Sequence, residues 1–370
     1  MRIVLIRLSA LGDIVHTWPL AVALRAARPD AHLTWVVEER LRPLVDGHPA
    51  VDCVLTADTR GWRRRPFDAA TRAGIAMLRT RLHELGPDLA LDPQGVVKSA
   101  LVTRWTGAAE RIGLARPWRR ERLAGLAYTA TLPGSRDQRH VVASNLELVR
   151  AVGATPPSPL PTPDGRWLLA RCAGRPSPVA ALPPYLALLP GAGRADKLLP
   201  VEDLAEVARR AAGAGLVVQI LWGPGEVERA AAVAALVGGR AVVAPPTDLA
   251  GLVQVLAGAR AVVGGDTGPV HLAASLGVPV LAAFTTTDWR RNGPLGPAVE
   301  VVSGAAAGGG RPSGSARAAR PGRVPPAELA AALDRLLGGR WEAGGMVGGA
   351  EILRFGAGPA RPAGHGGSVF

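Results

Sequence analysis

Short runs of apolar residues alternate along the chain with longer segments in which apolar residues recur every three or four positions. This alternation is typical of βα units that build a parallel sheet. In the first part of the chain it predicts strands at 3–6, 33–37, 52–55 and 89–91, a helix at 17–27 and a long helix that ends near Gly86. These elements together predict one α/β domain.

A proline-rich stretch at 155–164 interrupts this pattern and marks a linker or a domain boundary. The pattern then restarts, with strands predicted at 185–189, 216–221, 241–244, 261–264 and 278–284, and helices at 201–212, 226–237, 248–257 and 325–337. Residues 304–323 predict a loop, and the chain beyond Gly338 is rich in glycine and aperiodic. We therefore expect doubly wound domains at 1–165 and 166–338, followed by a disordered tail at 339–370.

Two such domains in tandem place a cleft between the carboxyl ends of their sheets, where ligands bind in this architecture. The first loop that follows a strand there is RLSALGDIVH, residues 7–16. Asp13 is expected in the cleft near a helix N-terminus, although its position fits an ordinary capping residue equally well. A dinucleotide fingerprint would need three spaced glycines, and only Gly12 is present. This absence argues against a sugar-nucleotide epimerase or dehydrogenase that uses a nicotinamide.

A second loop, PGAGRADK at 190–197, follows the first strand of the second domain and leads into a helix, whose start is expected to supply unpaired N–H groups to a ligand. Its small residues Ala192 and Gly193 allow the backbone to approach a phosphate, and Lys197 adds a point charge. Lysine occurs only at Lys98 and Lys197 in a chain that otherwise uses arginine, so a compact ammonium is indicated at Lys197. A surface lysine without a function is the alternative.

Two further loops carry candidate donor-binding groups. In GGDTGPVH, residues 264–271, the Asp266 carboxylate, the Thr267 hydroxyl and the amides of Thr267 and Gly268 are suited to sugar hydroxyls and a diphosphate. His271 either reaches the same ligand or packs locally at the helix start. Glu226 and Glu228 follow another strand and compete to bind a ribose. Either glutamate can instead complement the helix dipole.

The excess of basic residues limits the classes of binding partner. Lys plus Arg number 43 against 30 Asp plus Glu, a formal net charge of +13, which favours anionic partners such as nucleic acid, phosphorylated lipids or nucleotide sugars. No nucleic-acid-binding module is recognisable, so specific nucleic-acid binding is not expected. The basic residues of the first domain are suited to phosphates or carboxylates on a large acceptor, or form a solvated face: Arg60, Arg63, Arg64, Lys98 and Arg120.

Cysteine usage and hydropathy bear on the compartment. The only cysteines are Cys53 and Cys172, which fits a reducing cytosol and excludes a disulfide framework or a cysteine zinc cluster. Charged residues interrupt the apolar N-terminus before a signal-peptide length is reached, and no uncharged stretch is typical of a membrane span. We expect a soluble cytoplasmic protein that touches a membrane surface.

Several stretches together resemble glycosyltransferase family 9, and most closely its heptosyltransferase I branch. They are RIVLIRLSALGDIVHTWP at 2–19, TWVVEE at 34–39, the arginines at 60–64, LDPQGVVKS at 91–99, PGAGRADKLLP at 190–200 and VGGDTGPVHL at 263–272. The resemblance implies a GT-B fold with two Rossmann-like domains that face each other across a cleft. It also implies inverting transfer of heptose from ADP-heptose to the Kdo of Kdo-lipid A, in lipopolysaccharide core synthesis at the cytoplasmic face of the inner membrane. No cofactor is implied, and because no DxD cluster is evident we expect transfer without a metal ion.

The resemblance also assigns roles. Asp13 is expected to be the catalytic base and Lys197 to face the donor diphosphate. The remaining donor-binding residues are Ala192, Gly193, Glu226, Asp266, Thr267, Gly268 and His271, and the acceptor-binding residues are Arg60, Arg63, Arg64, Lys98 and Arg120. Ala192 and Gly193 replace hydroxyl residues that are common in this branch, and TTTDW at 285–289 departs from the usual G-x-T-D-P. Heptosyltransferase II, or another family 9 enzyme with a different sugar or acceptor, is the alternative.

Overall fold

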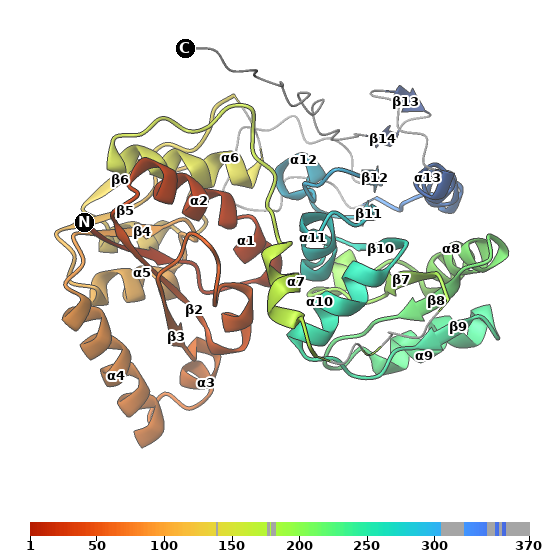
Figure 1. The fold of residues 1–370 in the computed structure, drawn as a ribbon, viewed down its shortest axis with the longest axis horizontal. Helices are drawn as coiled ribbons and strands as arrows, with labels where there is room; N and C mark the ends of the chain where they lie inside the picture. Colours follow the sequence, from red (N-terminus) through yellow and green to blue (C-terminus); the bar gives the residue numbers. More distant parts are fainter. Residues whose placement is uncertain are drawn as a thin grey trace, which may run out of the picture.

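The computed structural model describes residues 1–137, 140–175, 178, 183–304 and 322–338, and the backbone of two short strands. Two α/β halves lie side by side, each built on a six-stranded parallel sheet (Figure 1). The expectations of a loop at 304–323 and a disordered tail at 339–370 lie outside the described residues, apart from 304 and 322–323 and the two strands β13 (Gly345–Val347) and β14 (Ala350–Ile352).

The N-terminal sheet has the order β3-β2-β1-β4-β5-β6. Its strands are β1 (Arg2–Ile6), β2 (His32–Glu38), β3 (Cys53–Ala57), β4 (Leu89–Asp92), β5 (Glu110–Leu114) and β6 (Ala130–Leu132). The strand β1 lies at the centre, where Ile3 pairs with both Leu33 and Leu89. Helices cover both faces of this sheet, which explains the nearly continuous apolar sequence of the inner strands. The four predicted strands are confirmed, but β5 and β6 were not predicted.

Two layers of helices enclose this sheet. One layer is α1 (Leu11–Val15), α2 (Trp18–Ala27), η1 (Glu39–Leu44), α6 (Val141–Leu146) and η3 (Glu147–Val152), and the other is α3 (Thr59–Arg64), α4 (Ala69–Leu85), α5 (Val97–Trp105) and η2 (Arg122–Ala127). As predicted, the long helix α4 ends at Gly86, whose φ of 51° is left-handed. Glycine adopts this conformation at little cost, so it terminates the helix efficiently.

The C-terminal sheet has the order β12-β11-β10-β7-β8-β9. Its strands are β7 (Tyr185–Leu189), β8 (Val217–Ile220), β9 (Ala241–Val243), β10 (Ala261–Gly265), β11 (Val280–Phe284) and β12 (Val299–Ser303). Its helices are α7 (Trp167–Cys172), η4 (Ala195–Lys197), α8 (Val201–Gly213), α9 (Val227–Val237), α10 (Leu249–Gly258), α11 (Gly268–Ser275), α12 (Trp289–Asn292) and α13 (Pro326–Gly338). Each strand and helix predicted in this half is present, and β12 was missed.

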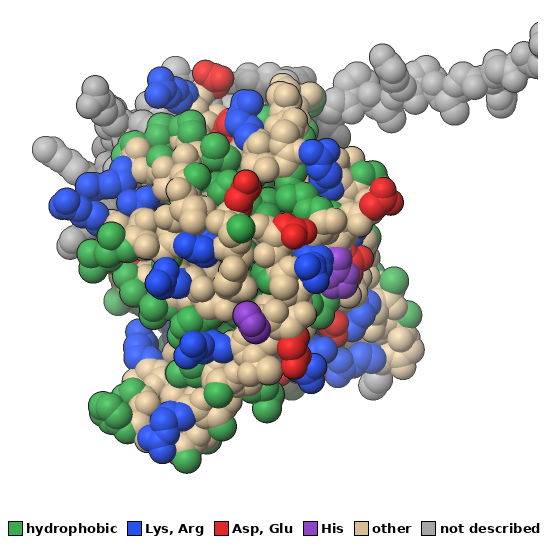
Figure 2. All heavy atoms as spheres, turned by 90° about the vertical axis from the view of Figure 1, so that its left-hand side faces the viewer, with side chains coloured by type: hydrophobic (Ala, Val, Ile, Leu, Met, Phe, Trp, Pro, Cys, Tyr) green, Lys and Arg blue, Asp and Glu red, His purple; other side chains and the backbone are tan. Residues whose placement is uncertain are grey.

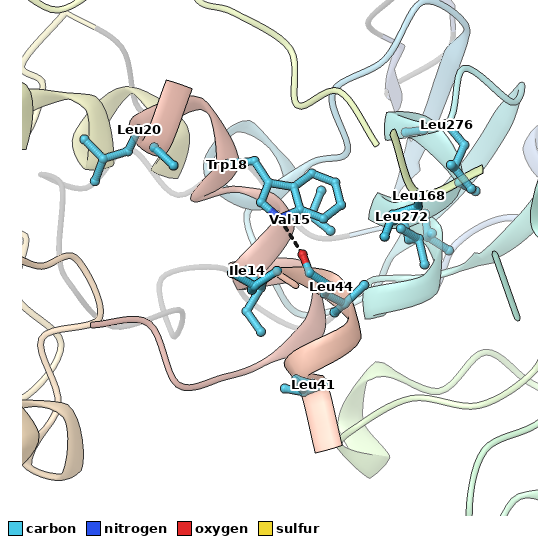
Figure 3. Close-up of a cluster of buried hydrophobic side chains, with 14 of the residues drawn as sticks. Ile14, Val15, Trp18, Leu20, Leu41, Leu44, Leu168, Leu272 and Leu276 are labelled. Carbon is cyan, nitrogen blue, oxygen red and sulfur yellow. Dashed lines mark hydrogen bonds between the residues drawn. The ribbon is translucent and has the colours of Figure 1, made fainter. Parts of the chain in front are cut away.

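The two halves share a hydrophobic cluster where α1, α7 and α11 meet (Figure 1). Figure 3 shows Val15 and Trp18 of the N-terminal half facing Leu168, Leu272 and Leu276 of the C-terminal half. The Trp18 indole donates a hydrogen bond of 2.9 Å to the Leu44 carbonyl, which fixes the ring in this cluster. The junction is thus packed like a protein interior. None of the helices in the described residues has both the length and the apolar composition needed to cross a bilayer.

Candidate functional site

The loop that carries Asp13 lies directly against the loop that follows β10. A Cβ on Gly12 would lie 2.7 Å from Cδ2 of His271, and a Cβ on Gly268 would lie 2.7 Å from Cβ of Leu11. Real Cβ atoms do not approach so closely, so these two glycines allow α1 and α11 to meet. The contact places the predicted catalytic carboxylate beside the predicted donor loop, although the two are 253 positions apart between Asp13 and Asp266.

We expect the substitution Gly268→Ala to weaken this contact. Its new Cβ would meet the Leu11 Cβ at 2.7 Å and the Gly12 backbone nitrogen at 3.2 Å, and the backbone has little freedom to give way. Overpacking of this kind costs about 1–3 kcal/mol. The midpoint of urea unfolding should fall and turnover should drop. Gly213→Ala, where a Cβ meets nothing within 4 Å, is the matched control. Equal midpoints for both variants would contradict the expectation.

Asp13 is the third residue of α1. One of its carboxylate oxygens accepts a hydrogen bond from the backbone, and the other is available to a ligand. Oδ2 accepts a hydrogen bond of 3.2 Å from the Ala10 amide, which is the capping role weighed in the sequence analysis. Oδ1 lies 3.9 Å from the Arg7 guanidinium. The side chain is 32% exposed, so a ligand in the cleft can reach it. Capping and proton transfer are therefore compatible.

Arg7, which the sequence analysis did not single out, is buried next to this carboxylate. Its guanidinium donates to the carbonyls of Asp13 (3.3 Å) and Pro93 (3.4 Å) and to the Thr17 hydroxyl (3.0 Å). Burial lowers the pKa of Arg7, while the Asp13 and Asp92 carboxylates oppose that shift. Arginine stays protonated in proteins, so a positive charge is fixed beside Asp13.

The donor loop is organised around the Asp266 carboxylate. It accepts hydrogen bonds from the Lys197 ammonium at 2.6 Å and the Thr287 hydroxyl at 2.7 Å, and His271 Nε2 lies 3.4 Å away. Burial alone would raise the pKa of Asp266, but the His271 hydrogen bond and the Lys197 charge hold it well below its ordinary value. The site therefore contains a lysine paired with an ionised aspartate. Thr287 lies in the TTTDW stretch and was missed by the sequence analysis.

The loop at 190–197 is held in a different way from the one expected. The helix α8 begins only at Val201, after η4, so its N-terminus does not directly follow Lys197. Arg229, which had no sequence signal, donates to the carbonyl of Pro190 (2.8 Å) at the start of the loop and to that of Leu199, two residues after its end. Ala192 is half-buried and Gly193 is exposed. A Cβ on Gly193 would meet nothing within 4 Å, which leaves this backbone open.

The structure distinguishes between Glu226 and Glu228, the two candidates for binding the ribose. The Glu226 carboxylate accepts a hydrogen bond of 2.8 Å from the Gly223 amide and lies where a Cβ on Gly191 would point, at 2.0 Å from its Cδ. It therefore faces the loop at 190–197. Glu228 lies on α9 and is exposed. Glu226 is accordingly the better placed of the two.

Thr267 and His271 flank the donor loop at the start of α11. The Thr267 hydroxyl oxygen is buried and has no hydrogen-bond partner within the described parts of the chain. A buried polar atom of this kind is costly unless a ligand or water satisfies it. His271 is buried against Asp266 and Gly12, which is the local packing weighed as its alternative role. His271 Nδ1 is likewise buried without a partner there, so each of the two side chains retains a polar atom that a ligand or water can satisfy.

The predicted acceptor cations divide into two groups. Lys98 donates to the Ser9 hydroxyl at 2.7 Å and to the buried Glu38 carboxylate at 3.0 Å. The Thr59 hydroxyl at the start of α3 donates to the same carboxylate. Glu38, which the sequence analysis did not single out, therefore links Lys98 to α3. The remaining predicted acceptor residues are exposed: Arg60, Arg63 and Arg64 on α3, and Arg120 in the loop after β5.

Three buried histidines join the two halves behind Asp13. The His16 ring lies 4.5 Å from the His271 ring and 5.2 Å from the His140 ring, each in an edge-to-face arrangement. Burial lowers the pKa of His140 to about 4 and lowers that of His16 well below 6.5. His16 and His140 are consequently neutral at pH 7, which allows the rings to pack together.

The free energy of unfolding should therefore decrease as the pH falls. The unfolded chain protonates His140 below its ordinary pKa of 6.5, whereas the folded chain does so only near 4. The unfolded state binds more protons in that interval, so stability is present above pH 6.5 and is lost as the pH falls toward 4, by about 3 kcal/mol for this residue. Urea unfolding at several pH values measures it. His140→Gln should flatten the slope between pH 6.5 and 4.5, and an unchanged slope would contradict this account.

Within the described residues, no group of three histidine, cysteine, aspartate or glutamate side chains could hold a metal ion. The family comparison supplies the deciding observation. Residues 75–309 match the model of "Glycosyltransferase family 9 (heptosyltransferase)". The chain belongs to glycosyltransferase family 9.

Curated relatives of this glycosyltransferase agree with the family model. The chain is 36% identical over 289 residues to lipopolysaccharide heptosyltransferase 1 of Pseudomonas aeruginosa, covering 78% of this chain and 79% of that protein. It is 33% identical over 291 residues to lipopolysaccharide heptosyltransferase 1 of Escherichia coli K12, covering 78% of this chain and 89% of that protein.

Solved structures of the family show the same architecture. E. coli heptosyltransferase WaaC with ADP superposes with a TM-score of 0.72 at 30% identity, over 85% of this chain and 96% of that one. E. coli ADP-heptose heptosyltransferase II gives a TM-score of 0.68 at 21% identity, over 91% and 98% of the two chains, which supports the fold alone. This glycosyltransferase therefore has the GT-B fold predicted from its sequence.

Proposed function

We propose that this family 9 glycosyltransferase moves a heptose from ADP-heptose to a hydroxyl of the Kdo in Kdo-lipid A, with inversion at the anomeric carbon. The observation that carries the proposal is the direct contact of the Asp13 loop with the loop that bears the Lys197–Asp266 pair. Relatives named lipopolysaccharide heptosyltransferase 1 and the solved heptosyltransferase with ADP support the choice of donor.

Asp13 supplies the base in this proposal. Its Oδ1 takes the proton of the attacking hydroxyl while that oxygen bonds to the anomeric carbon. The bond from the anomeric carbon to the diphosphate oxygen breaks on the opposite face, so ADP leaves with the electron pair. General-base assistance of this kind contributes about 10²–10⁴ in rate.

The leaving diphosphate gains negative charge as it departs, and the donor loop offers fixed positive groups there. Lys197 is 19% exposed, so its ammonium can accept a second anionic partner beside Asp266. The buried Thr267 hydroxyl has no partner in the described residues and can donate a further hydrogen bond to the diphosphate. Preorganised donors stabilise developing charge strongly in a site that excludes water. In this proposal these groups neutralise the charge of the leaving diphosphate, and transfer takes place without a metal ion.

A direct assay tests the proposed reaction. The purified protein is incubated with ADP-heptose and Kdo-lipid A, and the product is analysed by mass spectrometry and by NMR of the new anomeric centre. A mass gain of one heptose with inverted configuration is expected. Heptose transfer only to an acceptor that already carries a first heptose would instead favour heptosyltransferase II. Turnover with a different nucleotide sugar alone would overturn the choice of donor.

An anionic glycolipid acceptor would lie in the inner membrane, so we propose that the enzyme works at the cytoplasmic face of that membrane. One surface of the N-terminal half suits this location, because α5 and η2 pack through Ala100, Ala124 and Ala127 and expose apolar side chains beside them. These are Val97, Leu101, Leu123 and Leu126, and the last is 82% exposed. Figure 2 shows basic and apolar side chains interspersed on the outer face of this half, together with several acidic ones. Such a surface binds anionic bilayers through apolar burial and charge together.

Binding to vesicles tests this location. Vesicles that contain anionic phosphatidylglycerol should sediment the protein, and neutral phosphatidylcholine vesicles should not. The double substitution Leu123→Ser with Leu126→Ser should weaken sedimentation several-fold, since two leucines lose their burial in the bilayer. Leu236→Ser, an exposed leucine on α9 in the other half, is the control. Equal sedimentation of all three proteins would contradict the assignment of this surface.

A further inference from the structure

A cavity of about 450 Å³ lies between α2 and the segment at 153–166 that joins the two halves. Figure 1 shows this segment running from the region of α6 across to α7. The helix α2 lines the cavity along one face, with Trp18, Val22 and Ala26 at successive turns, and Pro157 and Pro161 come from the segment. Cavities of this size with mainly apolar walls are typical of small-molecule binding sites.

The cavity is separate from the cleft that holds Asp13. None of the described residues that line it belongs to the loops at 7–16, 190–197 or 264–271. An occupant would instead touch the N-terminal half and the segment that connects it to the other half. The proposed transfer reaction therefore leaves this cavity without a role.

The imidazole of His48 lies in the wall of the cavity. The residue is 3% exposed, and its ring packs edge-to-face against Trp167 with centroids 5.2 Å apart. The Ala50 amide donates a hydrogen bond of 3.1 Å to Nδ1. Burial lowers the pKa of His48 to about 4, so the ring is neutral at pH 7. Because Nδ1 accepts a hydrogen bond, the neutral ring carries its proton on Nε2.

The Nε2–H group of His48 has no hydrogen-bond acceptor among the described residues. Leaving a buried donor without a partner is costly, unless a ligand or a water satisfies it. Since the ring lines the cavity, this donor is available to a molecule inside it. The group therefore favours an occupant that carries an accepting atom.

The charges beside the cavity favour a neutral occupant. Asp164 is the one charged side chain among the described residues that line it, and its oxygens accept hydrogen bonds from Arg166 at 3.0 and 2.6 Å. Its negative charge disfavours an anion, and because that charge is already paired, a cation finds little to neutralise it. The Trp18 and His48 rings, with centroids 6.1 Å apart, favour contact with another aromatic ring.

We infer that this cavity is a binding site for a small, neutral aromatic molecule with one hydrogen-bond-accepting atom, which the Nε2–H group of His48 holds. Apolar contacts with α2 and the joining segment supply most of the affinity, and the hydrogen bond to His48 orients the ligand. The site is distinct from the donor and acceptor sites, so the inference does not depend on the proposed reaction.

Two ligands of the same shape test the site on the full chain. Quinoline carries a ring nitrogen that accepts a hydrogen bond, whereas naphthalene has carbon at that position, and both are neutral at pH 7. Saturation-transfer NMR measures their Kd values. Quinoline should bind about fivefold more tightly than naphthalene, since one hydrogen bond to a buried donor separates them. Equal Kd values for the two ligands, or no binding of either, would overturn the inference.

The substitution His48→Phe keeps a flat ring but removes the N–H group. The Kd of quinoline should rise to that of naphthalene, and the Kd of naphthalene should stay within twofold of its wild-type value. The retained naphthalene binding shows that the cavity has kept its form. A preference for quinoline that persists in this variant would contradict the assigned role of His48.

Filling the cavity provides a test that leaves His48 in place. Val22 lines the cavity and is 53% exposed, so Val22→Trp can be accommodated at the surface and should weaken binding of both ligands at least tenfold. Val227→Trp is the matched control, because Val227 is an exposed valine at the start of α9 in the other half. Unchanged binding to Val22→Trp would place the ligands elsewhere and overturn the inference.

Competition with ADP distinguishes the cavity from the cleft. Saturating ADP should displace neither ligand from the wild type, and saturating quinoline should leave the Kd of ADP within twofold. Displacement in either direction would place the ligands in the donor site and overturn the inference.

Discussion

Asp13→Asn should lower kcat by about 10²–10⁴-fold and leave the affinity for ADP within about twofold. The asparagine oxygen can still accept the hydrogen bond that the Ala10 amide donates at 3.2 Å, so the start of α1 keeps its local structure. What is lost is the capacity to take a proton from the acceptor hydroxyl. Single-turnover kinetics and calorimetry with ADP measure the two quantities.

A capping carboxylate that lies away from the cleft contact provides the control. Asp58 caps α3 by accepting a hydrogen bond of 2.9 Å from the Gly61 amide, and Asp58→Asn removes the charge from a similar position. This variant should retain activity within a few-fold. If Asp13→Asn turned over at the wild-type rate, or if both variants lost the same factor, Asp13 would not be the base.

Lys197→Met should weaken ADP binding by at least about 30-fold and lower kcat as well. Truncating one member of a hydrogen-bonded charge pair costs about 2–5 kcal/mol, much of it because the partner is left buried without its counterion. Here that partner is Asp266, whose remaining partners among the described residues are the Thr287 hydroxyl and His271. The like charge of a bound diphosphate would then face an unpaired carboxylate.

The other lysine provides the comparison for ADP binding. Lys98 pairs with Glu38 at 3.0 Å in the N-terminal half, so Lys98→Met should leave the Kd of ADP unchanged. Lys197→Met should also lower the free energy of unfolding, because Asp266 is left without its counterion. The double substitution Lys197→Met with Asp266→Asn should recover part of that loss, because the unpaired charge is removed. ADP affinity that is equal in wild type and Lys197→Met would remove Lys197 from the donor site.

Local sequence patterns were sufficient for the elements that line the cleft. The apolar strands β1, β7 and β10 are buried on both faces, and their sequences are continuous enough to predict. The strands that were missed lie at the edges of the sheets or carry charge: β5 begins with Glu110 and Arg111, and β12 contains the buried Glu300. Charged residues interrupt the apolar pattern of these segments. They form strands because they pair with neighbouring strands in the folded protein, which their own composition does not predict.

The site residues divide along a similar line. Asp266 directly follows β10, and Asp13 and Lys197 lie in the segments that leave the carboxyl ends of β1 and β7. Their convergence at the carboxyl edges of the sheets was therefore predictable from topology. Arg229 acts through the carbonyls of Pro190 and Leu199, which are far from it in the sequence, and in a chain with many arginines no local signal distinguishes it. Thr287 lies in a stretch that departs from the family pattern, which concealed its hydrogen bond to Asp266.

The meeting of Gly12 with α11 and of Gly268 with α1 has a consequence for engineering. Because each glycine lets a helix of one lobe pack closely against side chains of the other, a side chain added at either position would push the two lobes apart at this contact. Chimaeras that combine one lobe of this enzyme with the other lobe of a relative will therefore assemble only when both glycines are inherited together.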